Sequence, residues 1–172
     1  MPNLNILHLE DDTLDADLVR REVAKLTGTP TWLSATSGDD FRQMLENAQI
    51  DAILSDNQVP GISGIDALKL ARELRPGIPF VFVSGNADPR WAAHCIEAGA
   101  TDYVPKDQLW RLPGAVGRIH AARESQRLAT LTRSRAVLVD TVKALSLATW
   151  KPSPTSCAAR HASSTWPTAQ PS

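Results

Sequence analysis

Four short apolar runs each lead into a polar residue, and this recurrence limits the folds open to the chain more than any other feature. The runs cover residues 6–9, 51–55, 80–83 and 103–105. The polar residues at their carboxyl ends are Glu10, Asp11, Asp12, Asp56, Ser84 and Lys106. Runs of this length, bounded by turn-forming residues, are typical of β-strands.

Helical patterns separate these runs, so the sequence predicts an α/β fold with a parallel sheet. The predicted strands cover residues 4–9, 31–35, 51–55, 80–83 and 101–105. The predicted helices begin near Thr13, cover 38–48, 65–74 and 89–98, and begin again near Pro113. In the first helix, the apolar residues at helical spacing predict a buried face, which would comprise Leu14, Leu18, Val19 and Val23.

In open parallel sheets, ligands bind beyond the carboxyl ends of the strands, at the point where the strand order reverses. Acids, a hydroxyl and an ammonium would meet there. Carboxylate oxygens suit Mg²⁺, and a lysine with a hydroxyl suits an incoming phosphoryl group. The sequence therefore predicts a Mg²⁺-dependent aspartyl-phosphate site, with Asp56 as the nucleophile.

These motifs resemble the receiver domain of two-component response regulators over about residues 3–122. The matching residues are Glu10-Asp11, Asp56 followed by Val59-Pro60 and Gly64, Ser84-Gly85, and Tyr103 three residues before Lys106. The resemblance implies a doubly wound, flavodoxin-like sheet of five parallel strands in the order 2-1-3-4-5. One departure is that Pro105 precedes Lys106, whereas in many receivers a proline follows the lysine.

The resemblance also implies a role for each residue of the site. Asp56 would be the phosphoacceptor, with Mg²⁺ held by Asp11, Asp56, Glu10 and the backbone carbonyl of Gln58. Lys106 would pair with the phosphoryl oxygens. Ser84 would hydrogen-bond the phosphoryl group, and Tyr103 would change rotamer with it, so that both act as switch residues.

The function that follows is two-component signal transduction, in which a sensor histidine kinase or phosphotransfer protein phosphorylates Asp56 and thereby switches a surface for an unknown downstream protein. The chain would not be an enzyme beyond catalysing its own phosphorylation and dephosphorylation. The formal net charge is −1, so charge does not indicate nucleic acid as a partner. We expect no signal peptide and no membrane span, because no apolar run approaches the roughly 18 residues needed. A cytoplasmic location is expected.

Beyond the receiver region, residues 1–122, the chain is predicted to continue as a helical extension over 123–150. Its apolar residues at heptad spacing are Leu128, Leu131, Leu138, Val142 and Leu145, with Arg135 interrupting. This seam fits either a short coiled coil that forms a homodimer or a helix packed on its own domain. Residues 137–149 resemble the opening helix of an HD-GYP phosphodiesterase domain, which suggests a truncated remnant. Residues 151–172, rich in Pro, Ser and Thr, are predicted to be disordered.

Three other kinds of protein share parts of this pattern. Haloacid-dehalogenase phosphatases need Asp-x-Asp after the first strand, which residues 9–13 do not supply. A flavodoxin would need a phosphate loop there, and acids would repel the flavin phosphate. A phosphorylation-independent, receiver-like interaction module stays open, although the retained acids and Lys106 argue against it.

Overall fold

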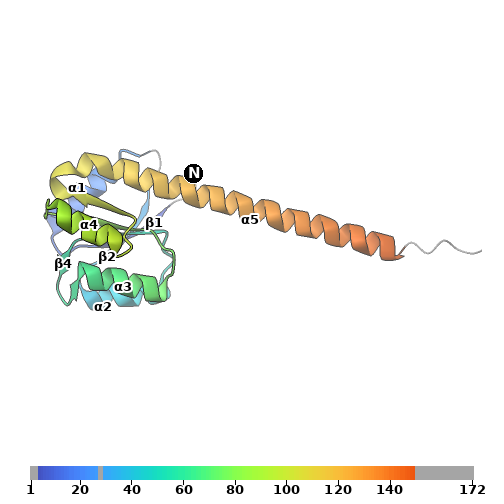
Figure 1. The fold of residues 1–172 in the computed structure, drawn as a ribbon, viewed down its shortest axis with the longest axis horizontal. Helices are drawn as coiled ribbons and strands as arrows, with labels where there is room; N and C mark the ends of the chain where they lie inside the picture. The colour runs from blue at the N-terminus through green and yellow to red at the C-terminus, as the bar shows by residue number, and fades with distance from the viewer. Residues whose placement is uncertain (1–3, 27–28, 150–172) are drawn as a thin grey trace, which may run out of the picture. The chain divides into compact units, whose positions relative to one another are not determined.

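The computed structural model describes residues 4–26 and 29–149 and contains a sheet of five parallel strands (Figure 1). The strand order is β2-β1-β3-β6-β7. The bounds are β1 Asn5–Leu9, β2 Thr31–Ala35, β3 Ala52–Ser55, β6 Phe80–Ser84 and β7 Asp102–Pro105. The predicted flavodoxin-like order 2-1-3-4-5 is confirmed, since β6 and β7 are the fourth and fifth strands of this sheet.

Helices cover both faces of the sheet, so its central strands are buried on both sides. The helices are α1 Thr13–Val23, α2 Gly38–Asn47, α3 Gly64–Leu74, α4 Pro89–Glu97 and α5 Leu112–Thr149. The helices α2, α3 and α4 pack on one face, and α1 with the first part of α5 packs on the other. Figure 1 shows α2 and α3 lying side by side.

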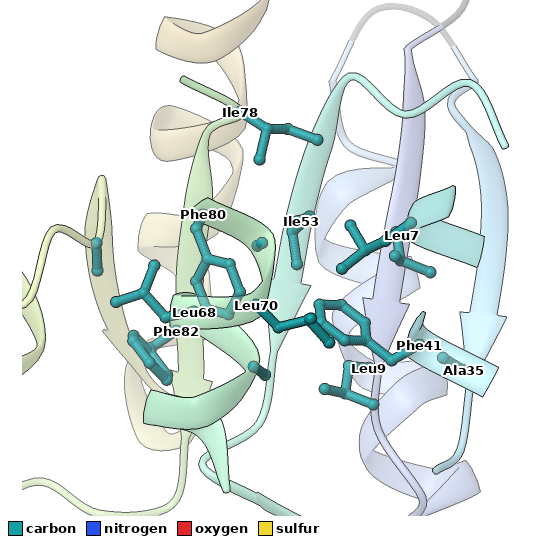
Figure 2. Close-up of a cluster of buried hydrophobic side chains, with 14 of the residues drawn as sticks. Leu7, Leu9, Ala35, Phe41, Ile53, Leu68, Leu70, Ile78, Phe80 and Phe82 are labelled. Atoms are coloured by element: carbon teal, nitrogen blue, oxygen red, sulfur yellow. The ribbon is translucent and has the colours of Figure 1, made fainter. Parts of the chain in front are cut away.

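Side chains alternate between the two faces along each strand, as the two-residue period of a strand requires. In β6, Phe80 and Phe82 join the core under α2 and α3, whereas Val81 and Val83 join the core under α1 and α5. Figure 2 shows the core under α2 and α3, in which Phe41 of α2 packs among side chains of β1 and β3. A sheet buried on both faces explains why these runs are almost entirely apolar.

The predicted buried face of α1 was partly wrong. Val19 and Val23 are buried, but Leu14 and Leu18 are exposed. Residues four apart lie on one stripe of a helix, and the stripe that meets the sheet is Asp15, Val19 and Val23 rather than Leu14 and Leu18. The sequence could not distinguish these two adjacent stripes, because each of them contains two apolar residues four positions apart.

Two short elements beside the site were not predicted. The loop after β3 folds into an antiparallel hairpin of β4, Gln58–Val59, and β5, Ile62–Ser63. Its turn contains Gly61 with φ of 82°, a backbone conformation that glycine adopts readily. After β7, a 3₁₀ helix, η1, covers Lys106–Arg111 before α5 begins.

The chain divides into two compact units, Met1–Arg127 and Leu128–Ser172. In the second unit α5 continues to Thr149, and Leu128, Leu131 and Leu138 are exposed. The side chains of Val142 and Leu145, and the whole predicted tail of 151–172, lie outside the described residues. The predicted domain boundaries stay predictions. No helix in the described ranges is long and apolar enough to cross a membrane.

Candidate functional site

Asp56 lies at the carboxyl edge of the sheet because β3 ends one residue before it. Its backbone N–H donates to the carbonyl of Leu9 at 2.9 Å, which extends the pairing of β3 with β1. One carboxylate oxygen, Oδ1, accepts from the N–H of Asn57 at 2.5 Å. The side chain is 18% exposed, so the carboxylate is held by the backbone and still reachable from solvent.

Lys106 joins three carboxylates at this edge. Its ammonium nitrogen, Nζ, lies 2.9 Å from Asp56 Oδ2, 2.7 Å from Glu10 Oε2 and 2.6 Å from Asp15 Oδ2. Lys106 begins η1 directly after β7, and Asp15 belongs to the first turn of α1. A lysine ammonium has three N–H donors, so these carboxylates use its full hydrogen-bonding capacity.

The pKa values of the site reflect both burial and this pairing. Burial lowers the pKa of Lys106, but the hydrogen bonds to Asp15, Glu10 and Asp56 outweigh that effect, and the pKa is raised above its ordinary value. For Glu10, whose side chain is only 2% exposed, burial raises the pKa and the hydrogen bond from Lys106 opposes the rise. Lys106 therefore stays charged and partly offsets the burial of Glu10.

The sequence reasoning missed Asp15. The i, i+4, i+8 spacing places Asp15 on the same stripe of α1 as Val19 and Val23. The sequence offered this stripe beside that of Leu14 and Leu18, and only the structure shows which of the two is buried. Helix side chains point back toward the N-terminus of their helix, and for α1 that end meets the carboxyl edge of the sheet. Asp12 caps the same helix, because its side chain accepts from the N–H groups of Leu14 and Asp15.

Ser84 and Tyr103 meet at the loop that follows β6. The hydroxyl oxygen of Ser84 accepts from the N–H of Asn86 at 3.2 Å, and the Tyr103 hydroxyl donates to the carbonyl of the same residue. Both side chains are buried. Burial also raises the pKa of Tyr103, so its hydroxyl is a neutral donor at physiological pH. The backbone of Asn86 thus connects the two predicted switch residues.

Of the other predicted site residues, Asp11 and Gln58 are exposed. Gln58 lies in β4, directly beyond the Asp56 loop, and the hairpin is attached to α2 by a hydrogen bond from the N–H of Gly38 to the carbonyl of Pro60 at 3.0 Å. The structure therefore brings Glu10, Asp56 and Lys106 into direct contact, with Ser84 at the end of the neighbouring strand β6.

The side chains of this site offer oxygen donors of the kind that bind Mg²⁺. Within the described ranges, no three side chains of His, Cys, Asp or Glu form a ready-made group for a metal ion. The donors themselves fit, because Glu10 and Asp56 place carboxylate oxygens within hydrogen-bonding distance of one shared cation, the Lys106 ammonium. Hard oxygen donors at adjacent strand ends are the ligands that Mg²⁺ prefers.

Comparison with known proteins decides the family. A family model for the response regulator receiver domain matches residues 6–113. The chain belongs to this receiver domain family. The resemblance of the sequence to receiver domains is therefore confirmed for the receiver region, and so is the prediction of a role in two-component response regulation.

Curated relatives agree with this assignment. The chain is 30% identical over 124 residues to the hydrogenase transcriptional regulatory protein HoxA of Cupriavidus necator, covering 72% of this chain and 25% of HoxA. It is 32% identical over 108 residues to the response regulator protein TodT of Pseudomonas putida, covering 63% of this chain and 45% of TodT. A cyclic di-GMP phosphodiesterase of Thermotoga maritima is 28% identical over 103 residues, which cover 60% of this chain and 27% of that protein. The chain thus spans less than half the length of these relatives.

Solved structures support the fold. The receiver domain of the Francisella response regulator 1452 superimposes with a TM-score of 0.63 at 20% identity, covering 70% of this chain and 99% of that domain. Receiver domains accept phosphoryl groups, generally bind Mg²⁺ at an acidic pocket and interact with histidine kinases and downstream effectors. The chain has the same fold as these domains.

Proposed function

We propose that Asp56 is the phosphoryl acceptor of this receiver domain, and that a phosphohistidine on a sensor kinase or phosphotransfer protein is its donor. In this transfer an oxygen–phosphorus bond forms at the Asp56 carboxylate while the nitrogen–phosphorus bond to the donor imidazole breaks. One observation carries the proposal: Asp56 is reachable at the carboxyl edge of the sheet and bonded to the Lys106 ammonium at 2.9 Å.

The residues around Asp56 suit this transfer. The Lys106 ammonium offsets negative charge as the anionic phosphoryl group approaches the carboxylate. The Ser84 hydroxyl, now an acceptor from Asn86, can turn its own O–H toward a phosphoryl oxygen because a hydroxyl both donates and accepts. The N–H of Asn57 continues to hold the carboxylate.

We propose Mg²⁺ as the cofactor, held by the carboxylates of Glu10, Asp11 and Asp56 and by the backbone carbonyl of Gln58. When bound, Mg²⁺ would neutralise charge on the transferring phosphoryl group. The support is the oxygen-only chemistry of these donors and the approach of Glu10 and Asp56 to one cation.

We propose that phosphorylation acts on a downstream protein through Ser84 and Tyr103. Both are bonded to the backbone of Asn86, so a Ser84 side chain whose oxygen moves toward the phosphoryl group would weaken one of the bonds that hold this loop. Coupling of this kind is typically worth about 1–3 kcal/mol, which shifts a population rather than rebuilding the domain.

We propose that the donor protein docks on an exposed apolar surface of the receiver domain next to the site. Leu14 and Leu18 of α1 and Trp110 of η1 are exposed, and these elements also carry Asp15 and Lys106. We expect Leu14→Gln to slow phosphoryl transfer from a histidine-phosphorylated protein while leaving transfer from acetyl phosphate unchanged. Equal slowing with both donors would contradict this surface as the docking site.

We propose that the second unit forms a homodimer through α5, since Leu128, Leu131 and Leu138 are exposed at heptad spacing. Sedimentation equilibrium should give a dimer for the wild type and a monomer for Leu131→Asp. A wild-type chain that stays monomeric at high concentration would contradict the dimer.

We propose that residues 137–149 are a remnant of an HD-GYP domain, because their sequence resembles its opening helix. A cyclic di-GMP phosphodiesterase is among the relatives that match this chain. We expect the receiver domain itself to catalyse only reactions of its own phosphoryl group. We also propose a cytoplasmic location, where sensor kinases present their phosphohistidine.

The decisive test is the intact mass of the protein after incubation with acetyl phosphate, with and without Mg²⁺. We expect wild type to gain one phosphoryl group only with Mg²⁺, and Asp56→Asn to gain none. Asp17→Asn is the matched control, because Asp17 is an exposed acid on α1 and pairs with Arg20. It should gain the same mass as wild type. No gain under any condition would leave a phosphorylation-independent interaction module.

A further inference from the structure

Asp15 forms the shortest ion pair of Lys106, although the proposed transfer assigns it no role. Its carboxylate lies 2.6 Å from the ammonium, closer than Asp56 at 2.9 Å. Asp15 lies in the first turn of α1, and its backbone N–H donates to the side chain of the helix cap Asp12. Asp15 therefore has a fixed base from which its carboxylate reaches the site.

Lys106 has no hydrogen-bond donor to spare. Its three N–H groups face Glu10, Asp15 and Asp56, so a phosphoryl group on Asp56 can bond to the ammonium fully only if one existing partner weakens. The carboxylate that would have to give up its N–H group thus competes directly with the phosphoryl group for the Lys106 ammonium.

Exposure and charge identify which partner can leave. The Glu10 side chain is 2% exposed, and separating a buried carboxylate from its cation is costly. Asp56 carries the phosphoryl group itself. Asp15 is 35% exposed and lies in the first turn of α1, where water and the helix dipole stabilise its charge without Lys106.

We propose that Asp15 is a positioning residue that holds Lys106 in the unphosphorylated domain and competes with the phosphoryl group for its ammonium. This inference rests on the proposed function of Asp56. It follows that the strength of the Asp15–Lys106 pair limits how tightly the site holds a phosphoryl group, and that weakening the pair favours the phosphorylated form.

The test uses beryllofluoride, a non-covalent phosphoryl mimic, and measures its dissociation constant on the full chain at saturating Mg²⁺. Asp15→Asn keeps the shape of the side chain and removes its charge, and we expect it to bind beryllofluoride about 3- to 5-fold more tightly, the upper part of the range for an exposed ion pair. Asp15→Glu keeps the charge and should bind within about twofold of wild type.

Asp17→Asn is the matched control for loss of one negative charge from α1, and it should also bind within about twofold of wild type. Urea unfolding of each variant separates the proposal from a purely structural ion pair. A structural pair would change the unfolding midpoint and leave the beryllofluoride affinity as it is in wild type.

Unchanged or weaker binding by Asp15→Asn would overturn the competition. Equal tightening by Asp17→Asn would also overturn it, because the effect would then be general electrostatics. These outcomes leave the proposed function standing as long as wild type gains a phosphoryl group on Asp56. If wild type neither binds beryllofluoride nor gains phosphoryl mass, the proposed function fails and the role of Asp15 fails with it.

Discussion

At the scale of single residues, the site depends on how one ammonium is placed among three carboxylates. One ammonium serves three carboxylates, which leaves the cluster negative before any cation or phosphoryl group arrives. Lysine suits this position because its ammonium is a compact charge whose three donors can face three directions. The planar guanidinium of arginine would pair with one carboxylate and leave the other two without a donor.

His8 gives a prediction for the pH dependence of stability. It is a buried imidazole in β1 whose Nε2 has no hydrogen-bond partner in the described structure. Burial, together with the positive charges of Arg20 and Lys106, lowers its pKa from 6.5 to about 4. Between these values the unfolded chain binds a proton that the folded protein does not, so stability falls as pH falls through this window.

We expect the free energy of unfolding to drop by about 2–3 kcal/mol more in wild type than in His8→Leu between about pH 7 and about pH 4.5. Urea unfolding at the two pH values measures the difference. His94→Gln, which removes an exposed imidazole from α4, should keep the wild-type dependence. A His8→Leu profile parallel to wild type would show that His8 is not the group responsible.

At the scale of elements, the site depends on how closely α3 approaches the loop after β3. Gly64 is the first residue of α3, and a Cβ added there would lie 2.6 Å from a ring carbon of Phe82, 2.9 Å from the Cα of Asn57 and 3.0 Å from the carbonyl of Asp56. Phe82 is fully buried and Asn57 offers backbone, so neither can move easily. Only glycine allows this approach.

We therefore expect Gly64→Ala to lower the free energy of unfolding by about 1–3 kcal/mol. It should also slow labelling by acetyl phosphate, because the displaced backbone carries Asp56. Gly114→Ala is the control, since its new Cβ would meet only the end of Arg118, at 3.6 Å, in a helix that favours alanine. Destabilisation of equal size in both variants would exclude the close approach as the cause.

Arg75 joins two further elements. It follows α3, and its guanidinium donates to the carbonyl oxygens of Leu45 at 2.7 Å, Ala48 at 3.1 Å and Glu46 at 3.3 Å at the end of α2. These carbonyls have no partner within their own helix, so the arginine completes the C-terminal turn.

Arg75→Lys keeps the charge and loses this fan of donors, and we expect it to cost about 1–2 kcal/mol of unfolding free energy in chemical denaturation. Arg42→Lys, at an exposed position on α2, should cost less than about 0.5 kcal/mol. A loss for Arg75→Lys as small as that of the control would argue against the capping role.

At the scale of the whole molecule, the buried core belongs to the first unit. The buried apolar residues run from Leu4 to Ile119, and both core clusters lie within Met1–Arg127. A unit with its own core is expected to fold alone. The proposed phosphoacceptor site is contained in the same unit.

We expect a chain ending at Arg127 to differ from the full chain by less than about 1 kcal/mol in unfolding free energy, because no buried core residue is removed. It should be labelled by acetyl phosphate at the full-length rate. Unfolding and mass measurements on both chains check this. A truncated chain that fails to fold would show that Leu128 and the residues after it contribute to the stability of the domain.

The sequence by itself determined the sheet and the edge at which the site lies. The short apolar runs of β1, β3 and β6 and the helical patterns between them are local properties that can be read without the fold. They place Glu10, Asp56, Ser84 and Lys106 at the carboxyl ends of parallel strands, because every such end meets the same edge.

Only the tertiary structure decided how these residues are paired. Lys106 and Asp15 are far apart in sequence, and their contact depends on how α1 is rotated against the sheet. The same rotation leaves Leu14 exposed although its spacing suits a buried face. A difference of one residue in the buried stripe changes no local propensity, so packing against the sheet settles it.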